Sequence, residues 1–445
     1  MNLNHADTIA AVATPIGQGG IGIVRVSGQQ VPDIAKKILG QLPKPRYATF
    51  SLFQDVEGYL IDQGIALYFP APHSFTGEAI LELHGHGGYV VMDQLLKTTL
   101  YLGARLAHPG EFSQRAFLNG KIDLAQAEAI ADLIESTSTQ AARCALRSLQ
   151  GAFSNKIEQL VEKLIELRSY IEAGIDFVDD EIDILADSRI NDTLKLLSTT
   201  VEAILAQAQQ GYLLKAGVNI ALIGEPNVGK SSLLNQLAGR ETAIVTPIAG
   251  TTRDVVREQI HLDGIPLHIT DTAGLRDTAD PIEQEGIRRT QQALKEADVV
   301  IVLLDERHHN DYLPALIADQ LSYDPLIIRN KIDLSGHTAG MQTEQCCYLS
   351  AKTGAGLEAF KGCLKQKIGL RAPTEGEFIA RRRHLDALQQ AKHAFQTSLN
   401  YIDSRQSELL AEELRQAQQA LTTITGAFST DDLLARIFST FCIGK

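Results

Sequence analysis

The sequence predicts a protein with α/β and all-α parts: an N-terminal α+β domain, a helical bundle domain, and a doubly wound domain inserted into the bundle. Apolar runs alternate with helical stretches from Val218 to about Leu370, which is typical of a doubly wound parallel sheet. Helical periodicity precedes and follows that region, so these two flanking helical segments should pack together into one bundle. We therefore expect four segments, which are residues 1–118, 119–215, 216–375 and 376–445.

Residues 1–118 mix strand and helix patterns. We expect strands at Thr8–Ala13, Ile21–Val26, Ile65–Phe69 and Ala79–Leu83, and helices at Val31–Leu39 and Tyr89–Leu102. The run Gly17–Gly22 has the spacing G-x-G-x-x-G, but strand-like residues follow it where a dinucleotide-binding fold needs a helix. We interpret these glycines as a tight turn between two strands.

The composition limits the classes of protein to which the sequence can belong. The 445 residues are 44% hydrophobic and 21% charged, the balance of a soluble globular protein with more than one domain. The net charge of −13 gives no support for direct nucleic-acid binding, because it repels phosphate. The run Arg381–Arg383 is more typical of a solvated helix face than of an RNA-binding patch. Without a signal pattern, and with Val299–Leu304 too short to cross a membrane, we expect a cytoplasmic location.

Cysteine and histidine usage predicts no structural metal. The five cysteines are an odd number without a C-x-x-C pair, which disfavours both a disulfide framework and a zinc site. His84 and His86 resemble a metal pair, but the glycines around them favour a turn before a helix, and we assign no metal there.

The stretch Gly224–Ser231 reads G-E-P-N-V-G-K-S and matches the phosphate-binding loop G-x-x-x-x-G-K-[ST]. It follows the apolar run Val218–Ile223 and precedes a helical stretch, so a strand end should lead into a helix N-terminus that attracts anions. Lys230 would neutralise the β- and γ-phosphates, and the Ser231 hydroxyl would bind Mg²⁺.

Three further motifs follow in the order that a GTPase needs. Thr252, in G-T-T-R-D, would bind Mg²⁺ and the γ-phosphate, and Asp271-Thr272-Ala273-Gly274 would hold the Mg²⁺ shell and sense that phosphate. Asn330-Lys331-Ile332-Asp333 supplies a carboxylate that can accept two hydrogen bonds from guanine, and Ser350-Ala351-Lys352 would brace the base. An ATPase has no use for Asp333, so the sequence predicts a Ras-like P-loop GTPase domain.

Along its whole length the sequence also resembles one family, the GTPases that modify the wobble uridine of tRNA, called MnmE or TrmE. The resemblance is carried by the GTPase motifs and by Gly19–Arg25, Leu81–Gly88, Pro109–Ser113, Arg115–Lys121 and Cys442–Lys445. It implies an N-terminal domain that dimerises, resembles folate-binding one-carbon enzymes and binds a 5-formyl- or 5,10-methylene-tetrahydrofolate. The implied folate contacts are Arg25, Glu82, Lys121 and Lys445.

The resemblance also implies partners and chemistry. The flavoprotein MnmG (GidA) would bring FAD and NADH, form a heterotetramer or larger assembly, and bind most of the tRNA. Together the proteins would add an aminomethyl or carboxymethylaminomethyl group to C5 of the uridine at position 34, with Cys442 in a catalytic role. Without the resemblance, Arg25 and Glu82 would be interpreted as strand-face charges and Cys442 as part of a frayed tail.

Hydrolysis is expected to depend on potassium. Leu275 occupies the position after D-T-A-G where Ras-like enzymes carry a water-orienting glutamine, and no arginine finger is evident. The Asn227 side chain with oxygens of Thr246, Ile248 and Thr251 would hold a monovalent cation instead. The resemblance implies that this ion is K⁺ and assigns water orientation to Glu283. The full set of expected GTP contacts is Asn227, Val228, Gly229, Lys230, Ser231, Ser232, Thr246, Pro247, Ile248, Ala249, Gly250, Thr251, Thr252, Asp271, Thr272, Ala273, Gly274, Asn330, Lys331, Asp333, Ser350, Ala351 and Lys352.

One alternative of a different class remains, a ribosome-assembly GTPase that acts as a timed binding module. Such proteins share the GTPase motifs, but they usually carry a basic RNA-binding domain, which this acidic chain lacks.

Overall fold

The computed structural model describes residues 7–15, 17–176, 187–238, 257–271, 292–308, 324–370, 378–427, 431–442 and 444. The chain forms two compact units, each treated separately below. The first contains Met1–Ala131, Ser148–Ser198 and Gln390–Lys445, and the second contains Asp132–Arg147 and Thr199–Gln389. Among the residues described, none of the helices is both long and apolar enough to span a bilayer.

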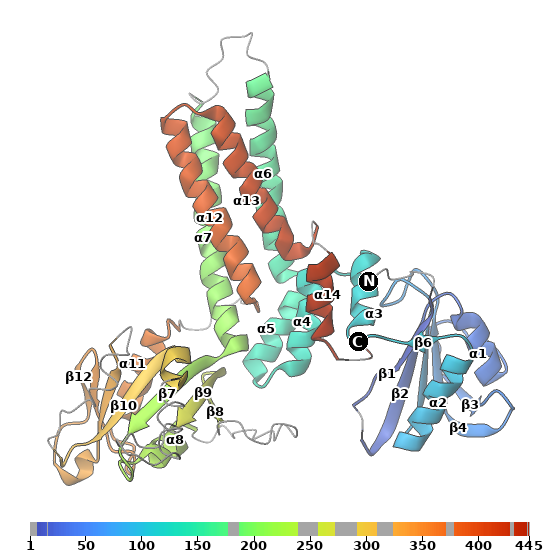
Figure 1. Ribbon diagram of the computed structural model, residues 1–445, viewed down its shortest axis with the longest axis horizontal. Helices are drawn as coiled ribbons and strands as arrows, with labels where there is room; N and C mark the ends of the chain where they lie inside the picture. Colours follow the sequence, from blue (N-terminus) through green and yellow to red (C-terminus); the bar gives the residue numbers. More distant parts are fainter. Residues whose placement is uncertain are drawn as a thin grey trace. The chain divides into compact units, whose positions relative to one another are not determined.

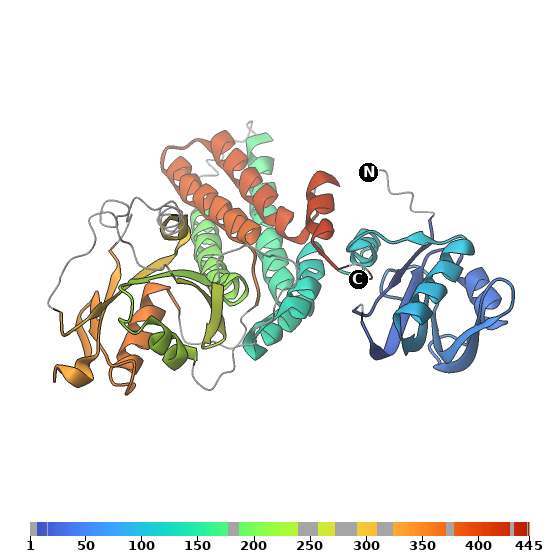
Figure 2. The ribbon, with the colours of Figure 1, turned by 60° about the horizontal axis from the view of Figure 1, so that its bottom comes forward.

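The first unit begins with a six-stranded sheet in the order β3-β4-β5-β2-β1-β6 (Figure 1). Its elements are β1 (Ile9–Val12), β2 (Gly19–Ser27), α1 (Val31–Leu39), β3 (Thr49–Gln54), β4 (Leu60–Phe69), β5 (Ile80–Gly87), α2 (Tyr89–Tyr101) and β6 (Arg105–Leu106). Alternate residues such as Val24 and Leu83 pack on one face with apolar residues of α1 and α2. Figure 2 shows these two helices beside the sheet. On the opposite face, Phe112 of α3 (Glu111–Leu118) packs against Ile9 and Ala11.

Two interpretations of glycine-rich stretches hold only in part, because Gly17 lies in the bend that joins β1 to β2, as expected, whereas other glycines lie within strands. Gly19 to Gly22 belong to β2, and His84 and His86 lie within β5. The backbones of β2 and β5 approach closely, because a Cβ on Gly87 would lie 2.7 Å from the Gly19 carbonyl oxygen, and a Cβ on Gly22 would collide with Met92 of α2. These glycines therefore permit strand pairing where turns were expected.

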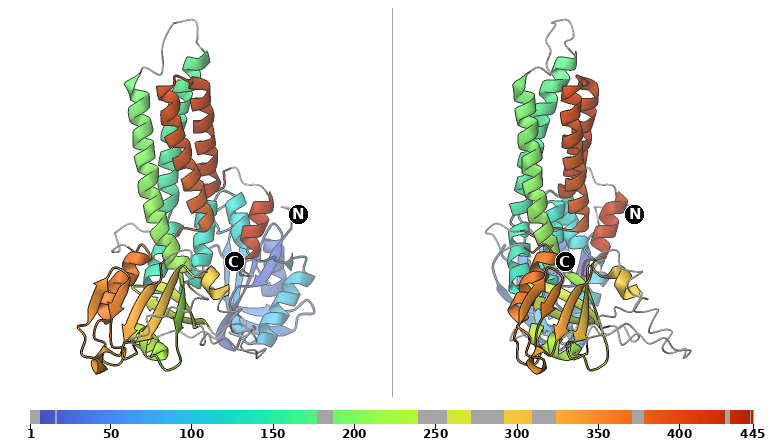
Figure 3. Two further views of the ribbon diagram at one scale, coloured as in Figure 1. Left: turned by 60° about the vertical axis from the view of Figure 1, so that its left-hand side comes forward. Right: turned by 90° about the vertical axis from the view of Figure 1, so that its left-hand side faces the viewer.

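The helical part of the first unit is built around α6 (Ala152–Asp176) and α13 (Ser407–Thr425), which pack together along their length. Residues 188–198 of α7 (Ser188–Ala216) and 390–403 of α12 (Arg382–Asp403) run beside them, as Figure 3 shows. The last helix, α14 (Asp431–Ser439), packs against α3 and α4 (Leu124–Glu135) through Phe438 and Phe441. The predicted joining of two helical segments distant in sequence is confirmed.

The stretch from 122 to 150, which lacks Gly and Pro, is not one helix. It breaks between α4 and α5 (Thr139–Leu149), where two serines satisfy backbone groups. Ser136 Oγ donates to the Asp132 carbonyl oxygen at 2.6 Å, and Ser138 Oγ accepts from the Ala141 N–H at 3.1 Å as an N-cap.

The second unit is a seven-stranded sheet in the order β12-β13-β11-β10-β7-β9-β8, and its five inner strands β13, β11, β10, β7 and β9 are parallel. Its elements are β7 (Val218–Gly224), α8 (Lys230–Ala238), β8 (Arg257–Leu262), β9 (Ile265–Asp271), β10 (Val299–Asp305), β11 (Leu326–Asn330), the short 3-10 helix η3 (Ile332–Leu334), β12 (Gly340–Thr343), β13 (Cys346–Tyr348) and α11 (Leu357–Lys367). Cys144 and Ala145 of α5 are buried in the same core, so this helix packs on the sheet. The predicted doubly wound domain is confirmed.

Arg381 does not lie on a solvated helix face, contrary to the sequence interpretation. Its guanidinium pairs with the buried carboxylate of Asp132 at 2.7 Å. Lys215, near the end of α7, pairs with the same carboxylate oxygen. One side chain of α4 therefore holds both the segment that enters β7 and the segment that leads into α12.

Candidate functional site

The predicted phosphate loop joins the end of β7 to the start of α8. Gly229 has a φ of 106°, and a Cβ there would collide with Asn330 Nδ2, so glycine is required on both counts. Asn227 also adopts a positive φ, of 62°. Lys230 Nζ donates to the Gly224 carbonyl oxygen at 2.8 Å, which holds its ammonium group over the loop. A helix N-terminus and a lysine thus meet at the carboxyl edge of the sheet, an arrangement suited to phosphate.

The base-recognition motifs are bonded to that loop. The Asn330 amide donates to the Val228 carbonyl oxygen at 2.8 Å and accepts from the Ala351 N–H at 2.9 Å. Ser350 Oγ donates to Asp333 Oδ1 at 2.6 Å, which orients the carboxylate expected to bind guanine. Three of the predicted motifs therefore form one hydrogen-bonded unit, although Val228 of the phosphate loop and Asn330 are 102 residues apart in the sequence.

Asp305 is a member of this site that sequence reasoning missed. Its carboxylate accepts from Lys331 Nζ at 2.7 Å, and Lys331 Nζ also donates to the Asn227 carbonyl oxygen at 2.8 Å. The Arg307 guanidinium, together with Lys331, holds the pKa of Asp305 well below its usual range. Its position at the end of the apolar run Val299–Leu304 was the available signal, because the carboxyl ends of parallel strands line the site.

Several predicted residues lie outside the described part of the chain. They are Thr246, Pro247, Ile248, Ala249, Gly250, Thr251, Thr252, Thr272, Ala273, Gly274, Glu283 and Lys445. The backbone of Asp271 ends β9, paired with Leu222 of β7, two residues before Gly224. Ser232, in the first turn of α8, and Lys352, which is exposed beside Ala351, complete the described members of the set.

A second group of polar residues lies on the face of the N-terminal sheet opposite α1 and α2. Arg25 of β2 and Glu82 of β5 are direct cross-strand partners, and their side chains pair at 2.9 Å. Glu82 also bonds His84 Nε2 at 3.1 Å. On the same face, Ile65 is the cross-strand partner of His84, and Phe50 is the partner of Ile65. Phe50 and Ile65 are 69% and 43% exposed, so the charged group borders an open apolar surface.

The C-terminal tail reaches this group. Arg25 Nη1 donates to the Gly444 carbonyl oxygen at 3.1 Å, and the Gly110 N–H donates to the Cys442 carbonyl oxygen at 3.3 Å. Gly444 has a φ of 94°, and a Cβ there would lie 2.6 Å from the Val12 carbonyl oxygen, so the tail runs closely along the end of β1. Two of the four predicted folate contacts, Arg25 and Glu82, are thus brought together beside the tail, where the Cys442 side chain is exposed.

Lys121 lies nearby in the same domain, with its Cε close to where a Cβ of Gly77 would be, at 3.1 Å. The adjacent Thr76 bonds Ser27 of β2 at 2.7 Å and accepts from the Asn119 amide through its carbonyl oxygen at 2.6 Å. These bonds fix the segment that carries Lys121 to the strand that carries Arg25.

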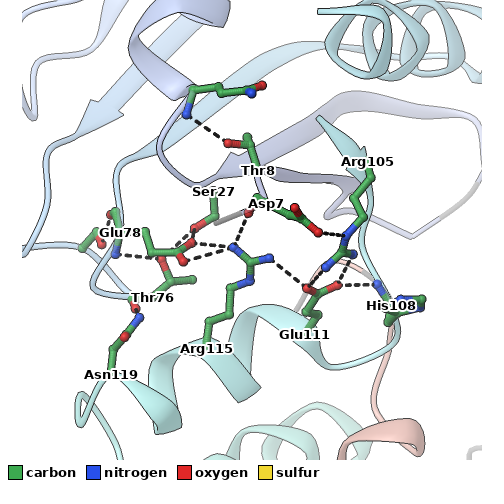
Figure 4. Close-up of polar contacts among 12 residues, drawn as sticks. Asp7, Thr8, Ser27, Thr76, Glu78, Arg105, His108, Glu111, Arg115 and Asn119 are labelled. Carbon is green, nitrogen blue, oxygen red and sulfur yellow. Dashed lines mark hydrogen bonds and ion pairs between the residues drawn. The ribbon is translucent and has the colours of Figure 1, made fainter. Parts of the chain in front are cut away.

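Helix α3, which supports the tail, is held to the sheet by buried ion pairs (Figure 4). Glu111, 1% exposed, pairs with Arg105 at 2.6 Å and with Arg115 at 3.0 Å, and accepts from the His108 N–H at 2.9 Å. Burial alone would raise the pKa of Glu111, but the bonds from Arg105, His108 and Arg115 outweigh it and lower the pKa to about 2. Arg115 also pairs with Glu78 at 3.0 Å, which extends the network across the sheet. This network was not predicted from the sequence.

Two family models match most of the chain. Residues 8–121 match the family model of the GTP-binding protein TrmE N-terminus, and residues 124–442 match that of the MnmE helical domain. A curated relative from Coxiella burnetii, the tRNA modification GTPase MnmE, is 57% identical over 99% of both chains. Among solved structures, the FeoB G-domain from Methanococcus jannaschii is 24% identical, with 34% of this chain and 97% of that chain covered and a TM-score of 0.26. Era from Aquifex aeolicus is 25% identical, with 39% and 65% covered and a TM-score of 0.25.

The matches to the two family models and to the curated relative extend over nearly the whole chain. The chain therefore belongs to the MnmE family of tRNA modification GTPases.

Proposed function

We propose that the protein hydrolyses GTP and uses the cycle to drive modification of the wobble uridine of tRNA. The hydrogen-bonded unit of phosphate loop, Asn330, Asp333 and Ser350 carries the GTPase part of the proposal. The curated relative, named as a tRNA modification GTPase, supports the modification part.

Guanine selection would rest on Asp333, whose carboxylate is oriented by Ser350. Ser231 and Thr252 would hold Mg²⁺, which neutralises charge on the phosphates. The position of Asp271 at the end of the strand beside β7 supports a metal at this edge, because hydroxyl and carboxylate oxygens suit Mg²⁺.

Hydrolysis would require K⁺, held by Asn227, Thr246, Ile248 and Thr251, and Glu283 would orient the attacking water. Pairing of two GTPase domains would stabilise the closed loop around the ion. The place of Asn227 within the phosphate loop, where its side-chain oxygen would lie near the phosphates, supports its part in the proposal.

The N-terminal domain would bind a 5-formyl- or 5,10-methylene-tetrahydrofolate through Arg25, Glu82, Lys121 and Lys445. The carboxylate of Glu82 suits the N–H groups of the pterin, and the apolar surface beside it suits the flat ring. Cys442, exposed in the tail that Arg25 contacts, would take part in the transfer chemistry.

The protein would act as a homodimer through the N-terminal domain, with the flavoprotein MnmG supplying FAD and NADH and binding most of the tRNA. The exposed apolar residues of β3 and β4, among them Phe50, Leu52 and Leu60, support an interface in this domain. The work would take place in the cytoplasm.

The test is a mass spectrum of tRNA nucleosides from a strain that lacks the protein. Loss of the C5-modified wobble uridine supports the proposal, whereas an unaltered spectrum with accumulating ribosomal precursors would favour a ribosome-assembly GTPase. GTP turnover of the purified protein in K⁺ and in Na⁺ at equal ionic strength tests the cation requirement. Asn227→Ala and Glu283→Ala variants should both lose most of the turnover in K⁺.

A further inference from the structure

The Glu82 carboxylate is held on both of its oxygens. Oε1 accepts from Arg25 Nε at 2.9 Å, and Oε2 contacts His84 Nε2 at 3.1 Å. The Glu82 and His84 side chains are 15% and 24% exposed, so solvent screens these bonds only in part. An ionised carboxylate can only accept, so His84 Nε2 must carry the proton of this bond.

We infer that His84 is a positioning residue, which fixes the plane of the Glu82 carboxylate so that its remaining lone pairs face a ligand with two adjacent N–H donors. An aminopyrimidine edge, such as that of a pterin, has this pattern. The inference rests on the proposed folate site and assigns it a residue outside the four contacts considered above. A carboxylate bonded on one oxygen alone can rotate, and two-point recognition weakens when the acceptor plane is free.

The position of His84 favours this role. It lies two residues from Glu82 on the same strand, so both side chains project from one face of the sheet. Its cross-strand neighbours on β2 and β4 are Ile23 and Ile65, which offer no competing polar partner. Glu82 is the polar side chain that the described residues place in hydrogen-bond contact with the His84 ring.

His86 provides a matched contrast in the same strand. Its ring bonds Asp62 at 2.8 Å, and it is 70% exposed. Hydrogen bonds from His86, including that from its backbone N–H, hold the pKa of Asp62 below its usual value despite partial burial, which by itself raises it. The two histidines of this strand therefore bond different carboxylates: His84 bonds Glu82, and His86 bonds Asp62.

The experiment is calorimetric titration of the full-length protein with 5-formyltetrahydrofolate. The variants are His84→Gln, His84→Asn and His86→Asn. Glutamine places an N–H at the distance from Cβ of the His84 Nε2 atom, whereas the asparagine amide is one bond too short to reach Glu82. Loss of one hydrogen bond to a charged group predicts about a tenfold weaker Kd for His84→Asn.

His84→Gln should bind within about twofold of the wild type, and so should His86→Asn. This pattern separates positioning from a merely structural role, because both replacements at position 84 are polar and of similar exposure. Equal affinity of His84→Asn and His84→Gln would overturn the inference while leaving the folate site intact. A wild-type protein that shows no heat at high micromolar ligand would overturn the folate site and the inference with it.

Discussion

The replacement Glu111→Gln tests how strongly the buried ion pairs hold α3 and the tail to the sheet. Glutamine keeps the shape of the side chain and imitates its protonated form. The pKa of Glu111 is lowered from 4.5 to about 2, which at about 1.4 kcal/mol for each pKa unit corresponds to about 3 kcal/mol of stability near neutral pH. Because the pKa of the folded state is the lower one, this stability is present above pH 4.5 and is lost as the pH falls toward 2.

Hydrogen exchange of the full-length protein, followed by mass spectrometry, measures the local stability of α3. At pH 6, peptides from α3 should lose about a hundredfold of their protection in Glu111→Gln. The difference in protection between variant and wild type should decrease as the pH is lowered from 4.5 to 3. Glu412→Gln is the matched control: the pKa of Glu412 is also lowered to about 2, by Arg415, but this pair is exposed and screened.

Equal protection of α3 in Glu111→Gln and wild type at pH 6 would refute the reasoning. So would a gap of constant size from pH 6 to pH 3, because it would show that the ionised carboxylate is not the source of the stability. A comparable loss in α13 from Glu412→Gln would show that exposed pairs matter as much as buried ones.

Four other outcomes are expected. Asp333→Asn should lower GTP affinity sharply and favour xanthosine triphosphate in a competition assay, and unchanged GTP binding would exclude Asp333 from base recognition. Asn330→Ala should weaken nucleotide binding roughly tenfold or more, because it breaks both the Val228 and the Ala351 bonds. Cys442→Ser should abolish tRNA modification and leave GTP turnover intact; full modification in vivo would remove Cys442 from the chemistry. Gly444→Ala should displace the tail and reduce modification, whereas Gly20→Ala, with open space around it, should not.

The sequence predicted where the phosphate loop and the Asn330–Asp333 motif lie in the fold, because each motif is contiguous and follows an apolar strand. It predicted α1 to the residue for a similar reason, since the apolar spacing of Val31 to Leu39 is regular. The edge strand β3 was missed because apolar residues lie on both of its faces: Phe50 and Leu52 are exposed, and the adjacent Phe53, which is buried, breaks the alternation of a half-buried strand.

Long-range contacts were beyond the sequence patterns. Nothing in the spacing of Glu111, Arg105 and Glu78 shows that they meet, because the contacts depend on how α3 packs on the sheet. The interpretation of Arg381 failed for the same reason: its partner, Asp132, is 249 residues away. A run of basic residues predicts a solvent-exposed helix face only when no buried carboxylate lies within reach of it.

The carboxylate of Asp132 has a consequence for how such a chain can be assembled. Residues 216–380 begin directly after Lys215 and end directly before Arg381, and both of these flanking residues pair with the Asp132 carboxylate. A second contact holds the same two ends together. Gly211 of α7 has no side chain, so the Phe378 carbonyl group packs directly against the helix. With the two ends already held together, the length of the intervening chain adds little to the entropy of closing the loop. Residues 216–380 therefore form a module whose two ends are held together, and a short linker between positions 215 and 381 should leave their pairing with Asp132 in place.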